Sequence, residues 1–219
     1  MSKIAALFGA TGLVGGHLLS LLAKDERWSR VVCVVRRAGA VEPSERVVVS
    51  VSDTLALDAE RVDDVFIALG TTIKKAGSRA AFRAVDEGAV VGAARAGRER
   101  GATGVFLVSA LGADARSLVF YNKTKGEAED AVRALGYERC VIARPSFLDG
   151  DRAESRPGER VGIAVTKALS FALVGGLAKY RAIAAADVAR VLVNEAKDGS
   201  ARAVAIESDD LAARARALG

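Results

Sequence analysis

The stretch Gly9-Ala10-Thr11-Gly12-Leu13-Val14-Gly15 joins a short apolar run at 3–8 to a segment at 13–22 whose apolar residues recur at helical spacing. In a strand–turn–helix unit, three glycines allow a tight turn, close approach of a pyrophosphate and close packing of the helix on the strand. The helix N-terminus adds unpaired N–H groups and the positive end of the helix dipole. The spacing is GxxGxxG rather than GxGxxG, so a glycine turn without a ligand is the alternative to the phosphate-binding turn that we predict at Gly9, Gly12 and Gly15.

Short apolar runs alternate with helical segments along the first two thirds of the chain. Strands are predicted at 3–8, 30–35, 47–51, 64–69, 104–109 and 139–143, and helices at 13–22, 79–100 and 120–135. Short, continuously apolar strands between helices are typical of a parallel sheet that is covered on both faces. The pattern therefore predicts an α/β fold of the doubly wound, mostly parallel type, the Rossmann fold, with helices on both faces.

The sequence changes character after Pro145. Residues 149–160 read as a charged loop, and 161–173 as a helix. A helix through Ala196 with Asp187 as its cap, a strand at 204–206 and a terminal helix capped by Ser208 complete the prediction. We interpret 1–219 as a single domain, in which 145–219 forms a small substrate-side region.

Composition argues against several classes of protein. Two cysteines and one histidine among 219 residues are too few for a disulfide framework, a four-cysteine zinc site or a histidine-rich metal site, so no metal is expected. A net charge of +5 is no nucleic-acid signature by itself. The uncharged stretch at 4–23 is interrupted by glycines, and no other segment is long enough to span a membrane. We expect a cytoplasmic protein that keeps its N-terminus, is a monomer or homodimer, and has no nucleic-acid or membrane partner.

Two arginines follow the second predicted strand and bear on the choice of cofactor. A site for NAD(H) often has Asp or Glu here, which accepts a hydrogen bond from the ribose 2′-OH. Arg36 and Arg37 instead suit a 2′-phosphate, so NADP(H) is preferred and NAD(H) remains possible. Two solvated surface arginines are the alternative. Asp53, near the end of the third strand, would meet the adenine amino group or cap the next turn.

Tyr121 and Lys125 form a YxxxK motif on the helix predicted after the fifth strand. A spacing of four places both side chains on one helix face. An ammonium group near a phenol favours the phenolate, so we expect Lys125 to lower the pKa of Tyr121 and to reach nicotinamide ribose hydroxyls. Tyr121 would then exchange a proton with a carbonyl or alcohol oxygen. Ser109 ends the fifth strand, where ligands of open α/β sheets bind, and its hydroxyl could polarise the carbonyl.

These motifs, in this order, resemble the short-chain dehydrogenase/reductase superfamily. The resemblance covers most of the chain through GATGLVG (9–15), VVRR (34–37), FIALGTT (66–72), FLVSALGAD (106–114), YNKTKGEAE (121–129) and ARPSFLDG (143–150). It is greatest to the atypical, extended-like branch of small Tat-interacting-protein-like oxidoreductases and their bacterial NAD(P)-binding relatives.

The resemblance implies a catalytic trio of Ser109, Tyr121 and Lys125. Further cofactor contacts are implied for Thr11, Gly12, Leu13, Val14, Leu69, Gly70, Thr71, Pro145 and Ser146. Ala110 stands where a second serine is often found. The expected function is NADPH-dependent reduction of a small carbonyl compound, or the reverse oxidation of an alcohol. A non-catalytic protein that senses NADP(H) is the alternative.

Overall fold

The computed structural model of the chain describes residues 2–149 and 180–219. Its elements, in chain order, are β1 (Lys3–Phe8), α1 (Leu13–Lys24), β2 (Trp28–Val35), β3 (Val47–Val51), β4 (Asp64–Ile67), α2 (Ile73–Ala76), α3 (Arg79–Arg83), the π-helical segment η1 (Ala84–Ala89), α4 (Val90–Glu99), β5 (Gly104–Val108), α5 (Phe120–Arg133), β6 (Arg139–Arg144), β7 (Leu148–Asp149), β8 (Ile183–Ala184), α7 (Ala185–Glu195), β9 (Arg202–Glu207) and α8 (Ser208–Ala217).

The main sheet has seven strands in the order β3-β2-β1-β4-β5-β6-β9, and each neighbouring pair is parallel. Strands β2 and β3 are added in turn on one side of β1. The chain then returns to the other side of β1, where β4, β5, β6 and β9 are added in the opposite direction. This reversal makes the crevice beside β1 and β4 the switch point, where ligands of open α/β sheets bind. The predicted Rossmann fold is confirmed.

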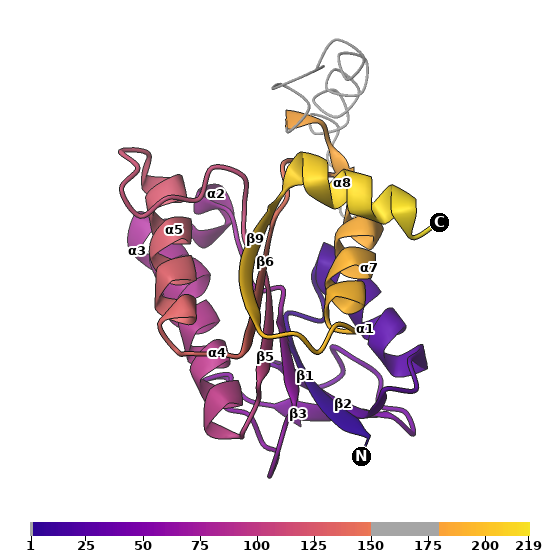
Figure 1. Cartoon of the computed structure of the whole chain (residues 1–219). Coiled ribbons are helices and arrows are strands. Elements are labelled where there is room, and N and C mark those ends of the chain that lie inside the picture. Colours follow the sequence, from indigo (N-terminus) through magenta and orange to yellow (C-terminus); the bar gives the residue numbers. More distant parts are fainter. Residues whose placement is uncertain (1, 150–179) are drawn as a thin grey trace.

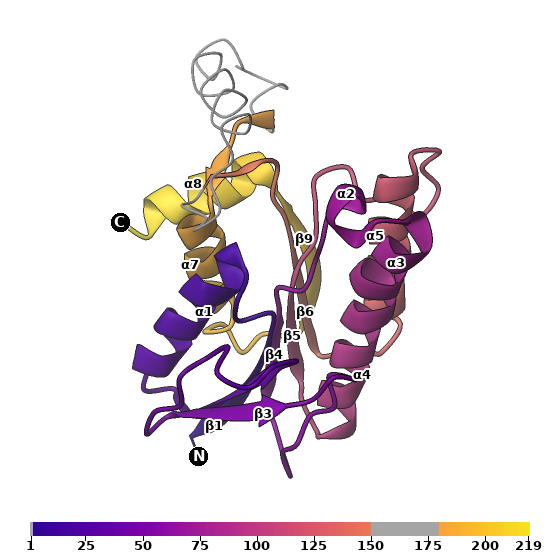
Figure 2. The same cartoon turned by 180° about the vertical axis from the view of Figure 1, so that it is seen from behind.

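Helices cover both faces of the sheet. Figures 1 and 2 show α1, α7 and α8 on one side and α2 to α5 on the other. Successive residues of a strand point to opposite faces, so Leu7 packs with Leu18 and Leu192, and Phe8 packs in the second core with Val90 and Val132. The apolar strands therefore serve two cores at once, which explains why they show no alternation with polar residues.

The helix predicted at 79–100 is interrupted. Its middle, η1, is a π-helix, and Asp86 within it is fully buried. A π-helical turn accommodates more residues than an α-helical turn, and such turns are frequent at functional sites. The helical spacing of the sequence did not predict this interruption, because α3, η1 and α4 follow one another without a break.

Three details at the C-terminal end differ from prediction. Helix α7 begins at Ala185, so Asp187 lies in its first turn and pairs with Arg190 instead of capping. Helix α8 begins at Ser208, whose hydroxyl bonds to Ser146, so it is no cap either. Strand β9 is longer than predicted. The predicted helix at 161–173 and the loop beyond Asp149 lie outside the described residues.

Candidate active site

The predicted site residues follow the carboxyl ends of the parallel strands, which all lie at one edge of the sheet. Gly9 follows β1, Arg36 follows β2, Gly70 lies beyond β4, Ser109 follows β5 and Pro145 follows β6. This edge is the upper one in Figure 1. Parallel pairing therefore gathers at one edge residues that are far apart in the sequence.

Two glycines of the first turn are required by close packing. Gly9 has φ +88°, and a Cβ built there would lie 2.5 Å from the carbonyl oxygen of Ala68. A Cβ on Gly15 would lie 1.9 Å from the carbonyl oxygen of Gly9. The Gly12 N–H donates to the same oxygen at 2.9 Å, which closes the turn. No side chain larger than hydrogen is accommodated at Gly9 or Gly15, so the first turn of α1 packs closely on the loop after β1 and on the end of β4.

The N-terminus of α1 fits the diphosphate of a dinucleotide. Its N-cap, Gly12, makes no side-chain hydrogen bond, and its first turn contains no acidic residue. Thr11 is exposed beside it, Leu13 is half-buried and Val14 points into the core. The first N–H groups of the helix are thus left without a capping side chain, at the end of the helix whose dipole favours an anion.

Arg36 and Arg37 lie at the same edge and are exposed. Neither forms an ion pair in the part of the chain that the structure describes, so both guanidinium groups are available for a phosphate. Asp53 is exposed in the turn after β3. It makes no contact that would assign it to adenine or to a cap.

Lys125 is held by a buried carboxylate that lies far away in the sequence. Its Nζ lies 2.7 Å from Asp86 Oδ1, and the two side chains are 7% and 0% exposed. The second oxygen of Asp86 accepts the Thr71 N–H at 2.9 Å. A Cβ on Gly70 would lie 3.4 Å from Asp86 Oδ1 and 3.7 Å from Lys125 Nζ. The structure therefore brings Gly70, Thr71, Asp86 and Lys125 together around one ion pair.

Tyr121 lies one helical turn before Lys125, half-buried, with its ring centroid 5.4 Å from that of Phe82. Burial raises the pKa of Tyr121 to about 12, and the negative charge of Asp86 adds to the effect. The prediction that Lys125 lowers this pKa is wrong. The reason is that Asp86 balances the ammonium charge, so burial of the phenol decides the outcome.

Ser109 is buried and does not bond to Tyr121. Its hydroxyl donates to Glu129 Oε1 at 2.6 Å, and its N–H donates to the Ala143 carbonyl at 2.7 Å. In this arrangement Glu129 takes the hydrogen of the Ser109 hydroxyl, and the role of this hydroxyl in polarising a substrate carbonyl stays a prediction. Glu129 stands four residues after Lys125 on the same helix, so the spacing of the YxxxK motif could have revealed it.

Pro145 and Ser146 lie where β6 ends. Pro145 is buried, and its carbonyl accepts the Leu111 N–H at 2.9 Å. The Ser146 hydroxyl donates to the Arg181 carbonyl, and its N–H donates to Ser208 Oγ at 3.1 Å. Leu69 is half-buried beyond β4. Ser146 thus connects β6 to the start of α8.

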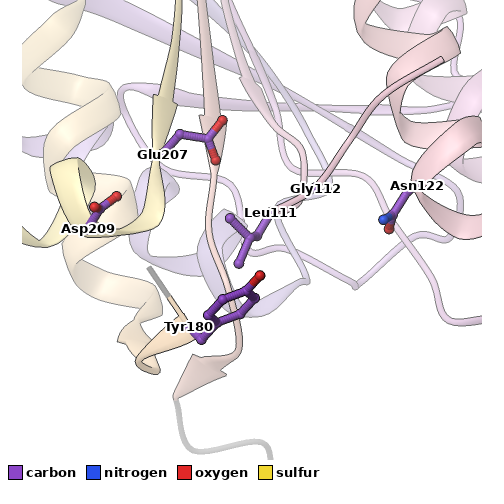
Figure 3. Close-up of a pocket in the computed structure, with 6 residues that line it drawn as sticks. All are labelled: Leu111, Gly112, Asn122, Tyr180, Glu207 and Asp209. Atoms are coloured by element: carbon purple, nitrogen blue, oxygen red, sulfur yellow. The ribbon is translucent and has the colours of Figure 1, made fainter. Parts of the chain in front are cut away.

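A cavity of about 510 Å³ opens at this edge (Figure 3). The residues that line it come from the loop after β5, from α5, from Tyr180 and from the junction of β9 with α8. They are Leu111, Gly112, Asn122, Tyr180, Glu207 and Asp209. Sequence reasoning missed all six, although Asn122 adjoins Tyr121 and Glu207 ends the last strand of the sheet.

No group of three or more His, Cys, Asp and Glu side chains in 2–149 and 180–219 is arranged to hold a metal ion. Within the same ranges, every helix is too short or too polar to cross a bilayer.

Curated relatives extend over most of the chain. The protein named "fmp52, mitochondrial" of Aspergillus clavatus is 40% identical, covering 70% of this chain and 70% of its own length. Its Candida albicans counterpart is 31% identical over 97% and 98% of the two chains. Both carry a mitochondrial name, which contradicts the predicted cytoplasmic location. The stretch at 4–23 on which that prediction drew is occupied by β1 and α1, so its apolar composition is explained by the fold.

Solved structures share the fold at low sequence identity. UDP-N-acetylglucosamine 4-epimerase of Methanobrevibacter ruminantium matches with a TM-score of 0.69 at 14% identity, covering 94% of this chain and 76% of the other. UDP-glucuronic acid 4-epimerase of Bacillus cereus, in complex with NAD, matches with a TM-score of 0.65 at 14% identity, over 94% and 77%. A family model described as NAD(P)H-binding matches residues 9–199, from the glycine turn to beyond α7. The chain therefore belongs to this family of NAD(P)H-binding proteins.

Proposed function

We propose that the chain is an NADPH-dependent oxidoreductase of the short-chain dehydrogenase/reductase type, in the atypical branch, and that it reduces a small carbonyl compound. One observation carries the proposal. Lys125 is buried in an ion pair with Asp86, beside the Gly70 backbone and one helical turn from Tyr121. A buried charged pair is costly to maintain, and this one lies at the sheet edge that presents the glycine turn.

Tyr121 has the properties of a general acid. Its raised pKa keeps the hydroxyl protonated at physiological pH, so it can donate to a carbonyl oxygen. Bound NADPH would supply the hydride that the carbonyl carbon accepts. The proton from Tyr121 completes the alcohol, and the phenolate left behind recovers a proton from solvent. A protonated tyrosine in the resting site favours reduction over alcohol oxidation.

Lys125 would position the cofactor. An ammonium group has three N–H donors, of which the ion pair with the single atom Asp86 Oδ1, 2.7 Å from Nζ, can engage one. The remaining donors can bind the hydroxyls of the nicotinamide ribose. Asp86 holds the lysine in place and, through the Thr71 N–H, fixes the loop after β4. This loop, with Leu69 and Gly70, would border the same ribose.

The test is turnover of a panel of aldehydes and ketones with NADPH, followed at the absorbance of the reduced cofactor. Tyr121→Phe removes the proton donor and keeps the ring against Phe82, so we expect a loss of turnover of about 100-fold or more without loss of NADPH binding. The matched control is Tyr137→Phe, which removes a buried hydroxyl that donates to the Ala94 carbonyl and does not line the cavity. Equal turnover by wild type and Tyr121→Phe would remove Tyr121 from the mechanism.

A second candidate function is a non-catalytic protein that senses NADP(H). It is favoured by the Ser109 hydroxyl, which is turned to Glu129 and not to Tyr121. This function predicts tight NADPH binding, no turnover of any carbonyl compound, and an interaction with another protein that depends on the cofactor. Efficient reduction of one panel member would exclude it as the main role.

A further inference from the structure

The side-chain amide of Asn122 has no hydrogen-bond partner within residues 2–149 and 180–219. Asn122 is half-buried in the first turn of α5, directly after Tyr121. It lines the cavity of about 510 Å³ (Figure 3). An amide has two N–H donors and a carbonyl acceptor, and polar groups that are withdrawn from water are normally paired. The amide is therefore available to a ligand that enters the cavity.

A glycine next to this amide leaves it uncovered. Gly112, in the loop after β5, has φ +79°, and a Cβ built there would lie 3.1 Å from Asn122 Nδ2. Both residues line the cavity (Figure 3). A side chain at position 112 would press on the amide or cover it, so the glycine keeps the amide accessible from the cavity.

The backbone around the amide is held in place. The Asn122 carbonyl accepts the Asp114 N–H at 3.1 Å, which ties the loop after β5 to α5. One turn further along α5, a Cβ on Gly126 would lie 2.1 Å from the backbone nitrogen of Ala115, so the same loop packs directly on the helix. A group that is fixed before its ligand arrives loses less freedom on binding. The amide is thus positioned in advance for a hydrogen-bonding group of the ligand.

The other polar groups of the cavity limit the charge of that group. Glu207 and Asp209 contribute carboxylates, and Glu207 is paired with Arg144 Nη1 at 2.9 Å. None of the six described lining residues is cationic, so an anionic group would meet carboxylates and no opposite charge. An apolar group would leave the Asn122 amide unpaired. A neutral group that both donates and accepts hydrogen bonds suits the amide best.

We propose that Asn122 is a substrate-binding residue that determines specificity. Besides its carbonyl group, the substrate carries a neutral group that both donates and accepts hydrogen bonds, such as a carboxamide. The assignment rests on the proposed reductase function, in which Tyr121 protonates the carbonyl oxygen. Consecutive residues of a helix point about 100° apart, so Tyr121 and Asn122 face different parts of one ligand. The group bound by Asn122 takes no part in the reaction and is unchanged in the product.

The kinetic test compares three ketones of the same shape. Levulinamide carries a carboxamide, 5-methyl-2-hexanone an isopropyl group in its place, and levulinate a carboxylate. Hydrogen bonds to Asn122 predict that kcat/KM with NADPH is at least about 10-fold higher for levulinamide than for either of the others. Asn122→Leu keeps the shape of the side chain and removes its hydrogen bonds, so the ratio of levulinamide to 5-methyl-2-hexanone should fall to about 1. A merely structural role for Asn122 would lower both rates and keep the ratio, and an unchanged ratio overturns the proposal.

Asn194→Leu is the matched control. The chain has two asparagines, and Asn194 is also half-buried, but it lies on α7. Helices α7 and α5 cover opposite faces of the sheet (Figure 1). The variant should keep the wild-type ratio of levulinamide to 5-methyl-2-hexanone. Loss of the preference in both variants would overturn the assignment to Asn122.

A binding measurement separates this proposal from the proposed function. The chain has two asparagines and no glutamine, so a nitrogen–proton NMR spectrum contains two side-chain NH2 pairs, and Asn194→Leu identifies the pair of Asn122. In the complex with NADP+ no hydride is available, and the ketone is not consumed. Levulinamide should shift the Asn122 pair and leave the Asn194 pair in place, whereas 5-methyl-2-hexanone should shift the Asn122 pair much less.

The NMR measurement decides even where Asn122→Leu does not fold. An Asn122 pair that does not move up to the solubility limit of levulinamide overturns the proposal. A shifted pair without turnover of any of the three ketones overturns the reductase function, while Asn122 stands as a ligand-binding residue.

Discussion

At the scale of single residues, the site is built from acid–base partners that lie on different elements. Tyr121 and Lys125 are neighbours on α5, and their spacing made them predictable from the sequence. Asp86 was not predictable, because its contact with Lys125 depends on how two helices pack. Glu129 was within reach, since it extends the same four-residue spacing by one turn. Sequence reasoning thus finds partners along one helix more readily than partners across the core.

Asp86→Asn tests the ion pair. Removing one partner of a buried pair should lower the free energy of unfolding by about 3–5 kcal/mol. The negative charge of Asp86 also raises the pKa of Tyr121, so the variant should ionise Tyr121 at lower pH than the wild type. Urea unfolding and the ultraviolet titration of tyrosine measure the two effects. Asp130→Asn, on the exposed face of α5, should change stability by less than about 0.5 kcal/mol. An unshifted titration in Asp86→Asn would contradict the coupling.

Arg36→Glu tests the preference for NADPH. Loss of a charge-assisted hydrogen bond to the 2′-phosphate should weaken NADPH binding by about 10- to 100-fold. NADH binding should hold or improve, since a carboxylate accepts the ribose 2′-OH. Calorimetric titration with both cofactors measures the ratio. Arg30→Glu, exposed near the other end of β2, is the control. Equal losses for both cofactors would refute the role in phosphate binding.

At the scale of elements, strands and the glycine turn were predicted well, because a continuous apolar run or a glycine turn is a local signal. The helix at 79–100 was predicted as one rod. In the structure it contains the π-helical segment η1, which includes Asp86. No local sequence pattern predicted this segment. The predicted caps at Asp187 and Ser208 failed for two reasons: Asp187 pairs with Arg190 within the first turns of α7, and Ser208 bonds to Ser146, which is distant in the sequence. The local sequence predicts that a helix or strand exists, whereas its contacts with the rest of the chain decide where it begins and ends.

Two adjacent glycines of α1 test the turn. In Gly15→Ala the new Cβ would lie 1.9 Å from the Gly9 carbonyl oxygen, so α1 must shift away from the turn. We expect a loss of about 1–3 kcal/mol in stability together with weaker NADPH binding. In Gly16→Ala the nearest atom lies at 3.7 Å, an ordinary contact, and the higher helix propensity of alanine should add up to about 1 kcal/mol. Urea unfolding with NADPH titration compares them. Similar behaviour of the two variants would show that the turn is not tightly packed.

At the scale of the whole molecule, the parallel sheet brings the residues that follow its strands to one edge, where they form the candidate site. The order of strand and helix predicted that edge, but not the cavity, whose lining comes from segments distant in the sequence. Composition gave the wrong location, because the apolar composition of residues 4–23 is explained by β1 and α1, whereas the relatives carry a mitochondrial name. What lies between Asp149 and Tyr180 was predicted as loop and helix and stays a prediction.

The stability of the fold should decrease at alkaline pH. Burial raises the pKa of Cys33 to about 12, of Cys140 to about 11 and of Tyr121 to about 12. The unfolded chain releases these protons at lower pH than the native protein does, so the free energy of unfolding should fall as pH rises from about 9 to about 12. Urea unfolding at about pH 8 and about pH 11 measures the fall. Cys33→Ala removes one such group and should flatten it. A stability that is constant or rising over this range would contradict the burial of these groups.

The transfer of deuterium tests the central claim most directly. NADPH carrying deuterium at the transferable position of C4 is incubated with the protein and a carbonyl substrate, and the product alcohol is examined by mass spectrometry. The account predicts one deuterium on the carbinol carbon with the wild type and none above background with Tyr121→Phe, which still binds NADPH. A wild-type protein that binds NADPH tightly and yields no labelled alcohol from any carbonyl compound would contradict it.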